Sequence, residues 1–125
     1  MTVRPSHREL SKKLRDATAL LRKGFVTILE PDVIIADAFE LGYSFKKEFN
    51  SIFQELLDVI TPDNYAGTRP PLRSYEAEIQ GAELFAFVAE STLLDGITVY
   101  FKFALYNDTL VIVSLHKDRK EGNHG

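Results

Sequence analysis

The stretch VYFKFALYNDTLVIVSLHK, residues 99–117, alternates apolar and polar residues on both sides of a short Asn107-Asp108 turn. Alternation with a period of two is typical of strands that bury one face, and two such runs around a turn predict a β-hairpin. Polar residues interrupt the apolar content at regular spacing, namely Tyr100, Lys102, Ser114 and His116. The pairing of the two strands decides whether these four residues only face solvent or form a site.

The length of the turn sets this pairing, because a shift of one residue moves every side chain to the other face. A two-residue turn would place Tyr100 and His116 on opposite faces, whereas a three-residue turn over 107–109 places them on the same face. The three-residue turn also creates a fully apolar face, formed by Ile97, Val99, Phe101, Phe103, Leu105, Val111, Val113 and Leu115. Burying one such side chain stabilises a fold by roughly 1.5 to 3 kcal/mol. The three-residue turn is therefore predicted.

Directly opposed residues of a hairpin have Cβ atoms about 5 Å apart. In the predicted pairing Tyr100 lies beside His116 and Lys102 beside Ser114, on the face that the helices leave open. One interpretation is an amphipathic sheet whose outer face is exposed to solvent, with these residues as ordinary surface residues. The alternative is a cleft, which is favoured by the apolar residues expected on the same face, Ala104, Leu110 and Ile112.

Three helices are predicted before the hairpin. The first, 7–23, starts at a capping box formed by Ser6 and Glu9 and ends at Gly24. The second has Pro31 in its first turn and ends at Gly42, and the third begins after Ser44. After a short helical turn near 62–65 and a loop, strands are predicted at 74–80, 83–90, 97–106 and 110–116.

Helices followed by strands predict an α+β domain over residues 1–118, with a disordered tail at 119–125. The three helices are expected to pack on one face of a three- or four-stranded antiparallel sheet. The chain of 125 residues has 45% hydrophobic residues, enough for one core, and contains no cysteine. Disulfides and thiolate chemistry are thus excluded. His7, His116 and His124 show no ligand spacing, so no metal or other cofactor is expected. No apolar run reaches the length of a membrane span, so a soluble cytoplasmic protein without membrane contact is predicted.

Charge is unevenly distributed along the chain. Residues 1–24 contain seven Lys or Arg against two acids, and residues 25–101 contain four against thirteen. A basic first helix can bind nucleic acid or an acidic partner, or it can be an ordinary solvated helix face.

The polar cluster of the hairpin contains the groups that metal-free RNA cleavage requires. A base must accept the proton of the 2′-hydroxyl, an acid must protonate the departing 5′-oxygen, and a cation must hold the phosphate. His116 can act as acid or base, Tyr100 can donate a proton, and Lys102 can neutralise phosphate. Arg69, Arg73 and Ser114 are candidates for binding the substrate. A Ser-His-Asp triad is less credible because Ser114 lies inside a strand rather than on a sharp turn.

Four short patches resemble the MqsR-type toxins, which are RelE-like endoribonucleases that cleave messenger RNA. The segment 99–117 is similar to their C-terminal hairpin, and RPSHRELSKK at 4–13 to the start of their first helix. ADAFELGYSF at 36–45 and ITPDNYAG at 60–67 are similar to a helix boundary and a turn of the family.

The resemblance implies a RelE-like fold and a toxin paired with a cognate antitoxin protein. Tyr100 matches the family's strand tyrosine, and His116 takes the place of a catalytic lysine. A second family lysine falls at Ala66 and is lost unless Arg69 substitutes for it. The oligomeric state stays open, a homodimer included.

A binding module is the alternative class. An acidic α+β domain can act as an immunity or inhibitor protein whose carboxylates mimic nucleic acid. The candidate carboxylates are Glu30, Asp32, Asp37, Glu40, Glu55 and Asp58. A ligand pocket between sheet and helices is a further option, but its aromatic residues, Phe85, Phe87, Phe101 and Phe103, are more simply explained as core.

Overall fold

The helices begin and end where caps and apolar periodicity coincide in the computed structural model, which describes residues 4–118. Helix α1 spans His7–Lys23, α2 Pro31–Leu41 and α3 Phe45–Val59, close to the predicted bounds. The Ser6 hydroxyl accepts the Glu9 amide hydrogen at 3.1 Å. The Glu9 carboxylate does not complete the predicted capping box and instead accepts hydrogen bonds from Arg4.

The sheet has four strands in the order β1-β4-β3-β2. Strands β2 (Phe85–Ser91), β3 (Ile97–Tyr106) and β4 (Thr109–Lys117) form an antiparallel meander. Strand β1 (Val26–Ile28) pairs in parallel with β4, so the sheet is mixed and the prediction of an antiparallel sheet is wrong. A strand of three residues is too short to show periodicity, and its direction is set by where the chain returns to the hairpin.

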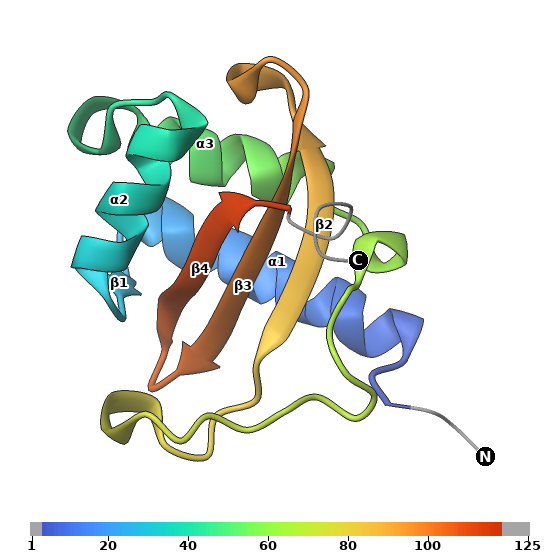
Figure 1. Cartoon of the computed structure of the whole chain (residues 1–125). Helices are drawn as coiled ribbons and strands as arrows, with labels where there is room; N and C mark the ends of the chain where they lie inside the picture. Colours follow the sequence, from blue (N-terminus) through green and yellow to red (C-terminus); the bar gives the residue numbers. More distant parts are fainter. Residues whose placement is uncertain (1–3, 119–125) are drawn as a thin grey trace, which may run out of the picture.

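Helices and strands form two layers with α2 at the edge (Figure 1). Helices α1 and α3 pass behind the strands, while α2 stands beside β4. The large buried side chains between the layers belong to one cluster, including Leu10, Ile34, Phe53, Phe87, Phe101 and Phe103. The four phenylalanines considered as ligand contacts are therefore core residues, each at most 1% exposed. No helix within residues 4–118 is long and apolar enough to cross a membrane.

The segment between α3 and β2 contains no strand, so the strand predicted at 74–80 is wrong. It forms two short turns, η1 (Pro62–Asn64) and η2 (Ala77–Ile79). Its backbone closes on itself, because the Ser74 carbonyl accepts from the Gly81 amide and the Ser74 amide donates to the Ala82 carbonyl. Ile79 is 2% exposed and packs on the sheet face opposite α1 and α3.

The hairpin differs from the predicted pairing in two places. Its turn has two residues, Asn107 and Asp108, with φ of 52° and 56°, and Tyr106 pairs with Thr109. Asn and Asp tolerate this left-handed conformation better than most residues, which suits a tight hairpin turn. The regular pairing then stops after Phe103 and Ile112 and resumes at Lys102 and Ser114. Val113 is the extra residue of a β-bulge.

The bulge restores part of the predicted arrangement. Tyr100 pairs with His116 and Lys102 with Ser114, which confirms these predicted neighbours. Between the turn and the bulge the faces of β4 are reversed relative to the prediction, whereas Leu105 of β3 packs against the main core as predicted. Leu110 and Ile112 lie in the main core, whereas Val111 and Val113 pack with Ile79 on the other face. The predicted tail, 119–125, lies outside the described residues.

Candidate active site on the open face of the sheet

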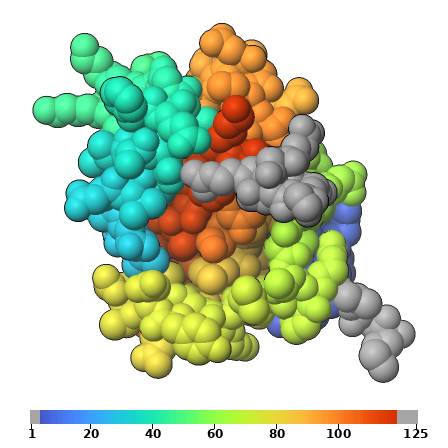
Figure 2. All heavy atoms as spheres, viewed as in Figure 1, coloured from blue at the N-terminus to red at the C-terminus, as the bar shows by residue number. Residues whose placement is uncertain are grey.

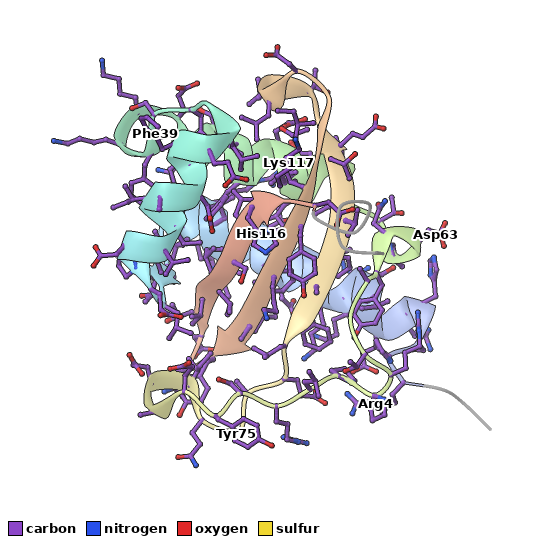
Figure 3. All side chains as sticks on the ribbon, in the orientation of Figure 1. Arg4, Phe39, Asp63, Tyr75, His116 and Lys117 are labelled. Atoms are coloured by element: carbon purple, nitrogen blue, oxygen red, sulfur yellow. The ribbon has the colours of Figure 1, made fainter. Side chains whose placement is uncertain are left out.

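Tyr100, Lys102, Ser114 and His116 occupy neighbouring positions on β3 and β4. Their face of the sheet is the one that α1 and α3 leave uncovered, and His116 points toward the viewer from the middle of it (Figure 3). Strand alternation places them there, because their chain neighbours Phe101 and Leu115 are fully buried in the main core.

The rings of Tyr100 and His116 stack in parallel. Their centroids are 5.1 Å apart and their planes differ by 11°. The Lys102 ammonium nitrogen lies 5.9 Å from the centre of the Tyr100 ring. That distance is at the outer limit of a cation–π contact, so the ammonium group remains available to an anion. A phenol, an imidazole and an ammonium group thus meet within one small area.

The hydrogen bond of His116 defines its tautomer. The Nδ1 atom lies 2.8 Å from the carbonyl oxygen of Lys117. A carbonyl oxygen only accepts hydrogen bonds, so Nδ1 carries the proton. In the neutral imidazole the lone pair is therefore on Nε2. This nitrogen can take a proton from a substrate, and the protonated ring can return one.

The environment of Tyr100 keeps its phenol neutral. Burial raises the pKa of Tyr100 above the ordinary value of 10.0. On the adjacent strand β2, Val88 is the neighbour of Tyr100 and Ala86 is the neighbour of Lys102. These aliphatic side chains contribute no charge that would favour the phenolate. At neutral pH Tyr100 is a hydrogen-bond donor and a potential acid.

The strands that carry the four residues form the floor of a hollow. Figure 2 shows the atoms of β3 and β4 set back between α2 on one side and the segment 61–84 on the other. Tyr65 belongs to this second wall and forms an isolated bridge with Phe87 of β2. Its hydroxyl donates to the Thr68 carbonyl at 2.5 Å, and a Cβ at Gly67 would lie 2.6 Å from the same hydroxyl oxygen. Gly67 therefore leaves the space that the ring occupies.

Tyr65 is a site residue that the sequence did not reveal. It lies close enough to Tyr100 for their charges to interact, and burial is the main cause that raises its pKa. Only its position after the Thr-Pro-Asp-Asn turn could have indicated it, since that turn returns the chain to the edge of β2.

The two candidate arginines have different positions. Arg69 stacks on the Tyr65 ring at 5.0 Å and donates to the Pro5 carbonyl at 2.7 Å, so it borders the hollow. Arg73 donates to the Gly81 carbonyl at 2.9 Å, within the closed loop. Arg69 can therefore supply positive charge beside Tyr65, whereas Arg73 stabilises the loop.

A side cavity continues from the open face around the edge of β2. Its volume is about 410 Å³, and Val88, the neighbour of Tyr100, lines it. Asn64, Glu90 and Thr98 contribute polar groups to its wall. The cavity can hold a planar ring next to the Tyr100 and His116 pair.

The carboxylates do not form a metal centre. Among residues 4–118 no cluster of three or more His, Asp or Glu side chains could hold a metal ion. Glu55 has a structural role, because it accepts hydrogen bonds from the Ser91 hydroxyl at 2.6 Å and from the Thr92 amide at 2.7 Å. It is thus not a free member of an acidic binding surface.

Comparison with models of known protein families gives no match, and no curated protein is significantly similar to the chain. The chemistry of the open face is therefore the main basis for assigning a function.

Proposed function

We propose that the chain is a metal-independent endoribonuclease that cleaves messenger RNA, a toxin of the MqsR type. One observation carries the proposal: Tyr100 stacks on His116, whose Nδ1 is bonded to the Lys117 carbonyl so that Nε2 is free of that bond, and Lys102 lies beside the pair. The short sequence patches that resemble this toxin class support it. The cytoplasm is the proposed site of action, because messenger RNA is translated there.

The three groups divide the work of a transesterification. Nε2 of His116 takes the proton of the 2′-hydroxyl as its oxygen bonds to phosphorus. The bond from phosphorus to the 5′-oxygen breaks, and the neutral phenol of Tyr100 protonates that oxygen. Lys102 balances the negative charge that builds up on the phosphoryl oxygens. The products are a 2′,3′-cyclic phosphate and a free 5′-hydroxyl.

The neighbouring groups have binding roles in this proposal. Arg69 attracts the phosphate that follows along the strand, and the hydroxyl of Ser114 is a hydrogen-bond donor next to Lys102. The cavity at the edge of β2 accepts the base of a flanking nucleotide. A cognate antitoxin would hold the activity in check by covering the hollow.

Cleavage of a labelled single-stranded RNA in the presence of EDTA tests the proposal. The wild-type chain should release a product that ends in a 2′,3′-cyclic phosphate, and replacing the 2′-hydroxyl by hydrogen should abolish cleavage. Tyr100→Phe, Lys102→Gln and His116→Asn should each slow single-turnover cleavage by about 10²-fold or more. His7→Asn is the matched control, because His7 is exposed on α1, the helix behind the sheet. Intact RNA with the folded wild-type protein would refute the proposal.

A second candidate function is an acidic binding module, and the surface of α2 favours it. Phe39 is 88% exposed on this helix and Ile35 is 46% exposed, among the carboxylates of Asp32 and Glu40 (Figure 3). Exposed apolar residues within an acidic surface suit a basic protein partner. Expression in bacteria separates the two functions, because a toxin arrests growth and is relieved by His116→Asn, whereas a binding module is harmless in both forms.

A further inference from the structure

Three arginines form a straight line on the outer face of α1. Arg8, Arg15 and Arg22 lie seven residues apart, and two turns of a helix advance by about 10.5 Å. All three are exposed, while Leu10 and Leu14 of the same helix are buried in the core. The line therefore extends over about 21 Å of surface. It lies on the side of the molecule opposite the open face of the sheet (Figure 1).

The guanidinium groups of this line make no polar contact with the part of the chain that the structure describes. Among the residues that the structure describes, none of the three forms a hydrogen bond or an ion pair, although Arg4, Lys12 and Arg69 all do. Arg22 is in the last turn of α1, where a positive charge favours the helix dipole. This explains one of the three positions and leaves Arg8 and Arg15 without a structural role.

A groove accompanies the arginine line. It has a volume of about 540 Å³ and runs between α1 and the end of α3. Arg15 and Arg22 form one wall, and Arg8 continues the line beyond the groove. Ser11 contributes a hydroxyl group, whereas the hydroxyls of Thr18 and Thr61 donate to the Leu14 carbonyl and to the Asn64 side chain. Its floor consists of aliphatic side chains, and no carboxylate lines the described groove. Guanidinium groups on a wall that contains no carboxylate are suited to binding phosphate.

We propose that Arg8, Arg15 and Arg22 bind the backbone phosphates of single-stranded RNA at a second, non-catalytic site. The proposal rests on the proposed function in its choice of RNA as the ligand. The groove ends at Thr61 and Pro62, directly before η1 and Tyr65, which borders the hollow. A strand that leaves the catalytic face around the edge of β2 therefore reaches the groove. The site adds affinity for long RNA and makes no contact with the scissile bond.

The surface fits an RNA backbone better than an acidic protein. Protein interfaces depend on a few large side chains that are buried at the centre, and aromatic residues are prominent among them. Among residues 4–118 no aromatic side chain lines the groove, and its leucines, Leu14 and Leu57, are already buried in the core. Evenly spaced positive charges match a regularly spaced polyanion, whose binding is driven by the release of counterions.

The test measures the salt dependence of RNA binding. The probe is a single-stranded RNA with 2′-O-methyl groups, which cannot be cleaved through the 2′-oxygen. Loss of three phosphate contacts should reduce the slope of log K against log salt concentration by about 2 in the Arg8→Gln/Arg15→Gln/Arg22→Gln variant. Glutamine has a helix propensity similar to that of arginine, so α1 is preserved. Circular dichroism of the variant verifies this.

The matched control is Lys46→Gln/Lys47→Gln, which removes two exposed charges from the first turn of α3, outside the groove. It should leave the slope unchanged apart from the small effect of net charge. Cleavage of a dinucleotide, which is too short to reach the groove, should be equal in the triple variant and the wild type. The proposal is overturned if the triple variant keeps the wild-type slope, or if the control reduces it equally. It is also overturned if a polyglutamate peptide displaces the RNA from the wild type but does not bind the triple variant, because the surface would then serve an acidic protein. Because the probe cannot be cleaved, an inactive wild type refutes the ribonuclease without affecting this result.

Discussion

Tyr100 and His116 lie opposite each other because Val113 is bulged out of the ladder between β3 and β4. The two-residue turn alone would pair Tyr100 with Leu115 and turn His116 into the core. The bulge adds one residue to β4, so the residues after Val113 pair one position further along and His116 comes opposite Tyr100. The candidate active site thus depends on a single irregular position.

Deletion of Val113 should preserve the site. Ile112 would still pair with Phe103, and Ser114 would follow directly opposite Lys102, in a regular ladder. The deletion removes a half-buried valine and is expected to lower the free energy of unfolding by about 1 kcal/mol. Nuclear Overhauser effects between the rings of Tyr100 and His116 are expected to persist. Their disappearance in a folded variant would contradict the assigned bulge.

The alkaline limit of cleavage should follow the role of Tyr100, whose neutral phenol is the proposed acid. Because burial raises the pKa of Tyr100 above 10.0, the alkaline decline should occur above the pH at which an ordinary tyrosine ionises. Single-turnover rates measured up to pH 11 locate this decline. An alkaline decline below pH 10 would contradict the role of Tyr100 as the acid.

Tyr43→Phe should stabilise the protein. Tyr43 is 6% exposed, and its hydroxyl has no hydrogen-bond partner among residues 4–118. Removing an unsatisfied buried hydroxyl is expected to increase the free energy of unfolding by about 1 kcal/mol at neutral pH. Urea unfolding measures this difference, with the exposed Tyr75→Phe as a control that changes little.

The same variant should resist alkali better. Burial, reinforced by Asp37, raises the pKa of Tyr43 to about 12. A group whose pKa is raised by folding contributes its full share of stability at pH values below its pKa in the unfolded chain, near 10. This contribution is lost as the pH rises toward 12. The wild type should therefore lose more stability than Tyr43→Phe over this window. Parallel losses in the two proteins would show that Tyr43 ionises as freely in the folded state as in the unfolded chain.

Arg4→Gln should weaken the stability of the protein at neutral pH but much less in acid. Arg4 bonds to Glu9 of α1 and, at 2.9 Å, to Glu83, and these contacts lower the pKa of both carboxyl groups below 4.5. A carboxyl group whose pKa is lowered by folding stabilises the protein at pH values above its pKa in the unfolded chain. This stabilisation is lost as the pH falls through its pKa in the folded state. The unfolding curves of variant and wild type should therefore converge below pH 4.5. Lys12→Gln, which breaks only the exposed pair with Asp16, is the control. If the difference in the free energy of unfolding between Arg4→Gln and the wild type stays constant in acid, the ion pairs of Arg4 do not contribute to stability as proposed.

Glu55→Ala should destabilise the fold. Its carboxylate satisfies the Ser91 hydroxyl and the Thr92 amide, and Ser91 is fully buried. Leaving these donors without acceptors is expected to cost about 1 to 3 kcal/mol in the free energy of unfolding. Asp58→Asn, exposed on the next turn of α3, should change it by less than about 0.5 kcal/mol. Equal effects of the two substitutions in thermal unfolding would rule out this role of the Glu55 carboxylate.

The helices were predictable because their signals are local. Ser6, Gly24, Pro31 and Gly42 act through the backbone of their own turn, and the apolar stripe of each helix repeats with the helical period. The parallel strand β1 was not predictable, because Val26–Ile28 gains its hydrogen bonds only from residues more than eighty positions later.

The pairing of Tyr100 with His116 was predicted for the wrong reason. Alternation along 99–117 does indicate that both side chains avoid the core, and burial of Phe101 and Leu115 enforces this. The pairing is produced by a tight Asn-Asp turn and a bulge at Val113. Together they satisfy the local geometry of the turn and the packing of both faces of the sheet.

The sequence by itself determines which side chains must be buried, since the free energy of burial depends on each side chain's own chemistry. The positions of Tyr65 and Arg69 beside the hollow depend on contacts between distant segments, which exist only once the chain has folded.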